Sequence, residues 1–168
     1  MKEALNLQSP YKVLLDKESL IYTFTTKYFI QYAFIFYEAL EYFESVSTYE
    51  NISKVYGCTL MKVSETRERL DFDTEKTINK IVEHFFSDKA NSLIYLCDTS
   101  DSKQLKRKYK FDTWYYRNEN KSNYEKLDVE ILVSDSVNYS SIIYHKENPF
   151  KSDLKIAFHE FTDELKDK

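Results

Sequence analysis

Apolar residues occupy every second position in two short stretches near the start of the chain. Residues 11–15 and 20–24 place aromatic and aliphatic side chains in this alternation, which is typical of half-buried β-strands. The polar segment 16–19 between them predicts a hairpin. Residues 29–37 are apolar on both sides and predict a central strand, and residues 56–63 predict a further strand.

Helical spacing replaces this alternation further along the chain. Asp73 or Thr74 is expected to cap a helix whose apolar residues recur at helical intervals. The stripe consists of Ile78, Ile81, Val82, Phe85 and Phe86. A last helix, from about residue 152, carries a seam of Leu154, Ala157, Phe158, Phe161 and Leu165. A short helix is also expected within residues 38–46.

The remaining apolar segments predict three more strands. Residues 93–97 form an unbroken apolar run, as in a buried interior strand. Residues 127–133 and 140–145 predict a final strand pair around a turn at 135–138. Strands and helices in this mixed order predict an α+β fold of two layers, with a mostly antiparallel sheet and helices packed largely on one face.

Composition and length narrow the functional classes. With 168 residues, 42% of them hydrophobic, the chain is expected to form a single globular domain over residues 1–168. We expect its ends, residues 1–10 and 166–168, to be frayed. Gly57 is the only glycine, which excludes the glycine-rich phosphate-binding loops of P-loop and Rossmann proteins.

The sequence predicts a cytoplasmic protein without a membrane segment. Residues 1–6 lead into no long apolar segment of the kind found in secretory signals. The longest apolar stretch, residues 28–37, is about ten residues long and too short to cross a bilayer. Cys58 and Cys97 each lie in an apolar, strand-like run, so we interpret them as buried thiols rather than as a disulfide or metal pair.

The predicted helix after Cys97 carries an unusual stripe on one face. Its members, at i, i+3, i+7 and i+10, are Gln104, Arg107, Phe111 and Trp114. In one interpretation the stripe faces outward, so that Arg107 pairs with a phosphate or carboxylate and Trp114 stacks on a flat group. In the other, Arg107 bridges to Asp98 or Asp101 and the rings pack inward.

The other two faces of this helix have different characters. We expect Leu105, Tyr109 and Tyr116 to face the core. A basic strip opposite them consists of Lys103, Lys106, Lys110 and Arg117. Residues 103–121 hold seven positive and two negative side chains, a local charge of +5, whereas the whole chain has a net charge of −4. The strip can attract an anionic ligand, while the acidic net charge disfavours nucleic acid.

No pattern in the chain marks a catalytic or metal site. Asp98 and Asp101 precede the helix at the end of a predicted strand, where carboxylates can cap the helix, hold a metal ion or act as an acid–base pair. We favour capping, because two carboxylates are few for a hard cation. The histidines His84, His145 and His159 lack the spacing of metal ligands. We therefore predict no catalytic residue, no metal and no cofactor.

Three blocks of sequence carry a resemblance to a known family. They are the strand Tyr22-x-Phe24-x-Thr26, the helix start Asp73 to Thr77-Ile78 with Phe85-Phe86 at its end, and the block Cys97-Asp98-x-x-Asp101-x-x-Gln104-x-x-Arg107-x-x-x-Phe111-x-x-Trp114. The chain resembles a bacterial family of small single-domain proteins, domain of unknown function 6169, from about Tyr11 to Val133. The resemblance implies no catalytic residues, because the family has no established activity. Its layout is similar to that of compact bacterial proteins suspected of toxin–antitoxin or defence roles.

Three functional hypotheses follow from these patterns. The first is a non-catalytic binding module whose face from Asp98 to Trp114 docks a protein partner or an anionic ligand, with Lys103, Lys106 and Lys110 adding attraction. The second is a metal-independent, toxin-like enzyme that acts on RNA. The third is a scaffolding homodimer that forms through the C-terminal helix.

Overall fold

The structure is a computed structural model that describes residues 1–97 and 102–167. The chain forms two compact units. Unit 1 comprises Met1–Tyr37 and Cys58–Asp88, and unit 2 comprises Glu38–Gly57 and Lys89–Lys168.

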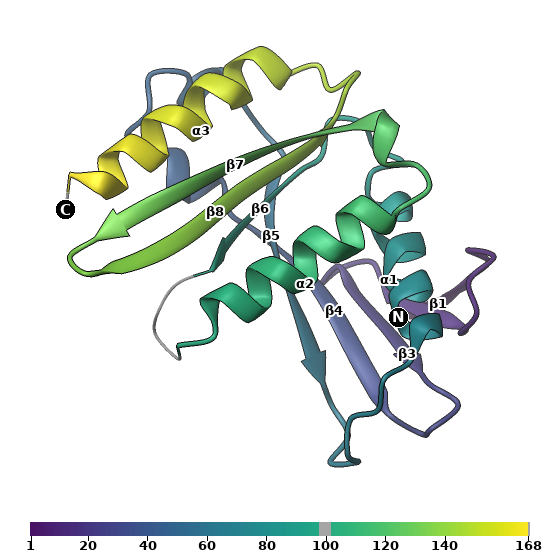
Figure 1. Cartoon of the computed structure of the whole chain (residues 1–168). Coiled ribbons are helices and arrows are strands. Elements are labelled where there is room, and N and C mark those ends of the chain that lie inside the picture. The colour runs from purple at the N-terminus through teal and green to yellow at the C-terminus, as the bar shows by residue number, and fades with distance from the viewer. Residues whose placement is uncertain (98–101, 168) are drawn as a thin grey trace. The chain divides into compact units, whose positions relative to one another are not determined.

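Unit 1 is built on antiparallel strands. Its first strands are β1 (Lys2–Leu5), β2 (Val13–Asp16), β3 (Ile21–Thr25) and β4 (Gln31–Glu38). Each of them pairs with the next in chain order, and the part of β5 (Val55–Lys62) that belongs to unit 1 lies beside β4 (Figure 1). The predicted hairpin and central strand are therefore confirmed. The first ten residues differ from the expected frayed end, because β1 pairs with β2.

A single helix, α1 (Phe72–Phe85), packs on the sheet of unit 1. The ring of Phe85 stacks on that of Phe36 with centroids 3.9 Å apart, and Ile78 and Ile81 are buried. The apolar stripe predicted for this helix is confirmed. The predicted cap is wrong: neither Asp73 nor Thr74 but Asp71 is the N-cap, and its carboxylate accepts a hydrogen bond from the backbone N–H of Asp73.

The described part of unit 2 contains three further strands and two α-helices. The strands are β6 (Ser92–Cys97), β7 (Tyr124–Val133) and β8 (Ser136–His145), and the helices are α2 (Gln104–Arg117) and α3 (Lys151–Lys166). The start of β5 pairs in parallel with β6, β6 pairs with β8, and β8 pairs with β7 (Figure 1). Both pairs that include β8 are antiparallel. The α+β class and the mostly antiparallel sheet are thus confirmed.

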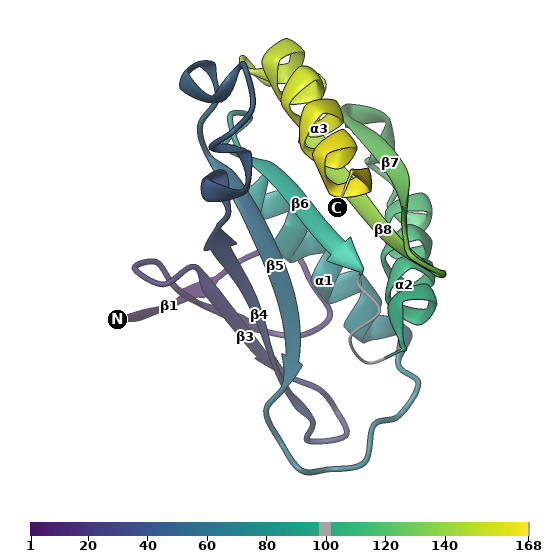
Figure 2. The ribbon, with the colours of Figure 1, turned by 90° about the vertical axis from the view of Figure 1, so that its left-hand side faces the viewer.

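The helices of unit 2 lie on opposite faces of its strands, as Figure 2 shows for α2 and α3. Ile94 packs into a core cluster with Leu154 and Phe158 of α3, whereas the ring of Tyr95 stacks on Phe111 of α2. Because adjacent residues of a strand point to opposite faces, the two helices cover different sides. Within unit 2, each face of the strands therefore carries one helix.

The apolar seam of α3 faces the core, as its spacing predicts. Leu154, Ala157 and Phe158 are fully buried and Phe161 is nearly so. The short helix expected within residues 38–46 is a 3₁₀ helix at Leu40–Phe43, and further 3₁₀ turns occupy Tyr49–Asn51 and Lys121–Asn123. None of the helices in the described part of the chain has the length and apolarity that a membrane crossing requires.

Candidate functional site

The predicted stripe of α2 lies against the strands rather than in open solvent. Its four residues, Gln104, Arg107, Phe111 and Trp114, are all half-buried. The ring of Phe111 stacks on Tyr95 of β6 with centroids 4.6 Å apart, and Trp114 meets Phe111 edge-on at 5.8 Å. The structure therefore supports the inward-facing interpretation of the aromatic residues.

Arg107 also turns toward the strands. Its guanidinium hydrogen-bonds the thiol of Cys97, which is fully buried. Burial raises the pKa of that thiol, and the adjacent guanidinium only partly offsets the effect, so Cys97 stays a neutral thiol. The proposed bridge from Arg107 to Asp98 or Asp101 falls on residues outside the described part of the chain. The N-cap position of α2 is Lys103, whose side chain makes no capping hydrogen bond.

The face of α2 that was predicted to be core is exposed, so that prediction is wrong. Leu105 is 62% exposed, Tyr109 76% and Tyr116 57%. The lysines of the predicted site, Lys103, Lys106 and Lys110, are exposed on the same outward side. We call this surface the α2 outer face, and it comprises Lys103, Leu105, Lys106, Tyr109, Lys110, Tyr116 and Arg117.

Beneath α2 lies an ion-pair network that sequence reasoning missed. The side chain of Lys126, on β7, is only 3% exposed, and its ammonium group lies 2.8 Å from a carboxylate oxygen of Asp112 on α2. Lys108 approaches the other oxygen of Asp112 at 2.5 Å. Asp128 forms a second ion pair with Lys126 and accepts a hydrogen bond from the hydroxyl of Ser141. We call these five residues the Lys126 network.

Aromatic rings surround the buried ammonium group. The Nζ atom of Lys126 lies 5.8 Å from the ring centroid of Tyr115 and 6.0 Å from those of Tyr95 and Tyr116. Burial raises the pKa of the Tyr95 hydroxyl well above its ordinary value of 10, so this hydroxyl stays protonated. The charge of Lys126 is therefore balanced by Asp112 and Asp128.

The network favours a structural role over a catalytic one. Burial would raise the pKa of Asp112, but hydrogen bonds from Lys108 and Lys126 outweigh this effect and hold the pKa below its ordinary value. An ammonium group held by two carboxylates is a poor nucleophile, and Ser141 is buried with its hydroxyl donated to Asp128. The contacts join α2 to β7. The sequence did not reveal these contacts, because the alternation of charged and apolar residues on β7 is also typical of a strand whose charged side faces solvent.

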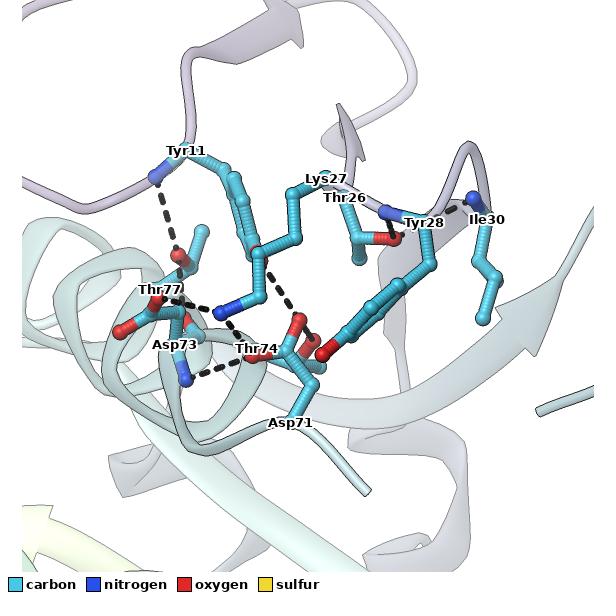
Figure 3. Close-up of polar contacts among 9 residues, drawn as sticks. All are labelled: Tyr11, Thr26, Lys27, Tyr28, Ile30, Asp71, Asp73, Thr74 and Thr77. Carbon is cyan, nitrogen blue, oxygen red and sulfur yellow. Dashed lines mark hydrogen bonds and ion pairs between the residues drawn. The ribbon is translucent and has the colours of Figure 1, made fainter. Parts of the chain in front are cut away.

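A second polar cluster fixes the start of α1 in unit 1 (Figure 3). The carboxylate of Asp71 accepts hydrogen bonds from the hydroxyl of Tyr11 at 2.6 Å and from the backbone N–H of Asp73 at 3.0 Å. Lys27 lies 3.8 Å from Asp71 and 3.3 Å from Asp73. Thr77, one turn later, accepts a hydrogen bond from the backbone of Tyr11. These contacts tie the cap of α1 to the segments before β2 and after β3.

The described residues include no group of three His, Cys, Asp or Glu side chains arranged to hold a metal ion. Of the histidines, His84 contacts the hydroxyl of Tyr22 at 3.0 Å, and burial lowers the pKa of its imidazole. His145 lies at the end of β8, and His159 is exposed on α3. Neither cysteine is part of a disulfide; Cys97 is buried as predicted, whereas Cys58 is only half-buried.

Comparison with known proteins places most of these elements in one family. The family of unknown function DUF6169 matches residues 71–163, which begin at the N-cap of α1 and extend into α3. The match thus includes α2 and the Lys126 network, and it lies further toward the C-terminus than the resemblance predicted from sequence. No curated protein matches the chain. Because the match covers more than half of its length, the chain belongs to the DUF6169 family.

Proposed function

We propose that this protein is a non-catalytic binding module that docks an acidic protein segment on the α2 outer face. The observation that carries the proposal is the composition of that face. Three large side chains, Leu105, Tyr109 and Tyr116, are more than half exposed beside four cationic residues. Exposed apolar groups gathered on one surface are characteristic of interaction sites, and tyrosine is enriched in protein interfaces.

The contacts under α2 support this role because they hold the helix in place. Phe111 stacks on Tyr95, and Asp112 is paired with the buried Lys126. With its inner side fixed to β6 and β7, the helix presents the outer face without a need to order it on binding. A preformed surface loses less conformational entropy when a partner docks.

The charges of the α2 outer face define the chemistry of the partner. Lysine and arginine side chains on one helix face attract carboxylates, and the exposed rings and Leu105 fit apolar side chains of the same segment. The net charge of −4 opposes long-range attraction of any polyanion, and it opposes a segment of mixed acidic and apolar residues less than a nucleic acid, which carries a charge on every phosphate. The seam of α3 packs in the core, which favours the α2 outer face over a homodimer through that helix.

Charge reversal on α2 tests the proposal. The probe is a fluorescently labelled synthetic peptide of alternating glutamate and leucine residues, followed by anisotropy at increasing salt. Lys106→Glu with Lys110→Glu should weaken binding by roughly tenfold or more, and Tyr109→Ala should also weaken it. The matched control is Lys151→Glu with Lys155→Glu, an exposed i, i+4 pair on α3, which should leave binding unchanged.

Two results would overturn this proposed function. One is equal peptide affinity of the α2 and α3 charge-reversal variants, which would show that α2 does not form the binding surface. The other is tight, strongly salt-dependent binding of a single-stranded RNA probe by wild-type protein that does not bind the peptide. That result would favour the RNA-acting hypothesis instead.

A further inference from the structure

Five large apolar side chains are exposed at one end of unit 1. They are Phe29 at 82%, Met61 at 51%, Val63 at 55%, Leu70 at 85% and Phe72 at 60%. Phe29 lies in the turn between β3 and β4, Val63 and Leu70 lie in the connection from β5 to α1, and Met61 and Phe72 lie where β5 ends and α1 begins. Figure 2 shows the turn and the connection at the same end of this unit. We call these five residues the apolar tip.

Contacts between the two segments hold the apolar tip together. The backbone N–H of Val63 donates to the carbonyl of Gln31 at 2.8 Å, and the N–H of Gln31 donates to the hydroxyl of Ser64 at 3.1 Å. On the other side of the turn, the guanidinium of Arg69 lies 5.1 Å from the ring centroid of Tyr28. Phe29 is therefore flanked by residues that contact the β5–α1 connection on both sides.

The turn presents Phe29 to solvent in an unfavourable backbone conformation. Phe29 has a φ of 61°, in the left-handed region that bulky residues avoid. Thr26 maintains this conformation. Its hydroxyl accepts hydrogen bonds from the backbone N–H groups of Tyr28 and Ile30 (Figure 3), and its carbonyl accepts one from the N–H of Phe29. A ring that is 82% exposed adds little to the core, so packing within unit 1 does not explain this arrangement.

The charges around the apolar tip identify its occupant. Residues 26–31 and 61–73 hold four cationic and four anionic side chains. The cationic ones are Lys27, Lys62, Arg67 and Arg69, and the anionic ones are Glu65, Glu68, Asp71 and Asp73. The carboxylate of Asp71 is held in the cap of α1 with its side chain 4% exposed, so Glu65, Glu68 and Asp73 are the anionic groups that reach solvent. A two-fold interface places the same surface on both sides, so it must carry both signs to be complementary to itself. An anionic membrane or a nucleic acid would instead require a positive excess.

We propose that two copies of this chain pair through the apolar tip, with their apolar side chains at the centre and charges of both signs at the rim. The apolar tip consists of residues of unit 1 and the α2 outer face of residues of unit 2, so different substitutions test the two proposals. A failure of one proposal leaves the other unaffected.

Sedimentation of the full chain tests this pairing. Between about 1 and about 100 µM the protein should pass from monomer to dimer, and Phe29→Ser with Leu70→Ser should weaken the dimer by roughly tenfold or more. The matched control is Leu132→Ser with Ile156→Ser, two exposed apolar residues of unit 2 that should leave dimerisation unchanged. Circular dichroism checks that each variant is folded.

A charge swap separates a specific interface from general hydrophobic association. Arg67→Glu and Glu68→Arg should each weaken the dimer, and the double variant, which restores four charges of each sign, should recover at least part of the affinity. A wild-type chain that stays monomeric over the whole range would overturn the proposal. So would a dimer that the Phe29 and Leu70 substitutions leave intact, or wild-type protein that binds anionic lipid vesicles without dimerising.

Discussion

Replacement of Lys126 with methionine removes a buried ammonium group and keeps most of its apolar length. In the wild-type protein this group is paired with Asp112 and Asp128 and lies among three tyrosine rings. The methionine side chain can still fill the space between those rings. The substitution therefore tests the charge of Lys126 rather than its volume.

The expected loss of stability follows from the exposure of the two carboxylates that remain. Removal of one partner from a fully buried ion pair destabilises a protein by about 3–5 kcal/mol. The side chain of Asp112 is 19% exposed and that of Asp128 is 40% exposed, so water solvates part of the charge that is left unpaired. Lys108 also remains beside Asp112. We therefore expect Lys126→Met to lower the free energy of unfolding by about 2–3 kcal/mol, below the fully buried range.

Urea denaturation, followed by far-UV circular dichroism, measures this change. Lys89→Met is the matched control, because Lys89 forms an ion pair with Glu147 in which both side chains are more than half exposed. That variant should unfold at nearly the wild-type urea midpoint, since solvent screens exposed ion pairs. Adding Asp112→Asn to Lys126→Met should recover part of the loss. A Lys126→Met protein as stable as the Lys89→Met control would refute the argument that the Lys126 network holds α2 in place.

Three further predictions concern pH, the cap of α1 and the core of unit 2. The pKa of Asp112 lies below its ordinary 3.8 in the folded protein, so the stability that this carboxylate contributes is present above pH 3.8 and is lost as the pH falls through the lower folded pKa. Asp112→Asn should therefore flatten the acid end of the pH–stability curve. An unchanged curve would contradict the conclusion that the ion pairs of Asp112 stabilise the fold. Asp71→Ala should reduce the free energy of unfolding by about 1–2 kcal/mol in urea titrations, and Asp71→Asn by less, because asparagine still caps a helix. Phe158→Ala should cost about 3–5 kcal/mol, whereas Ile156→Ala, on the exposed side of the same helix, should cost less than about 1 kcal/mol. Equal losses for the last two would show that the α3 seam is not the buried one.

Local patterns were sufficient wherever one physical effect dominated a segment. The stripe of α1 and the seam of α3 each gather large apolar residues on one side, with a single buried threonine beside them, so burial of that side is the favourable arrangement. The strands β2, β3, β4 and β6 were recognisable for the same reason. The cap of α1 was misplaced because Asp71, Asp73 and Thr74 are all good capping residues. A hydrogen bond from the hydroxyl of Tyr11, far away in sequence, distinguishes Asp71 from the others.

The rotation of α2 about its axis is what only the tertiary structure decided. Every face of this helix mixes apolar, aromatic and charged side chains, and none of its residues is fully buried. Two residues of the strands define its inner face: Tyr95 on β6 stacks on Phe111, and Lys126 on β7 pairs with Asp112. A helix with one apolar side contains the information about its orientation, whereas a helix held by stacking and ion pairs takes its orientation from distant residues. For this reason the sequence located α2 and its lysines, but only the fold showed that Leu105 and Tyr109 face outward beside them.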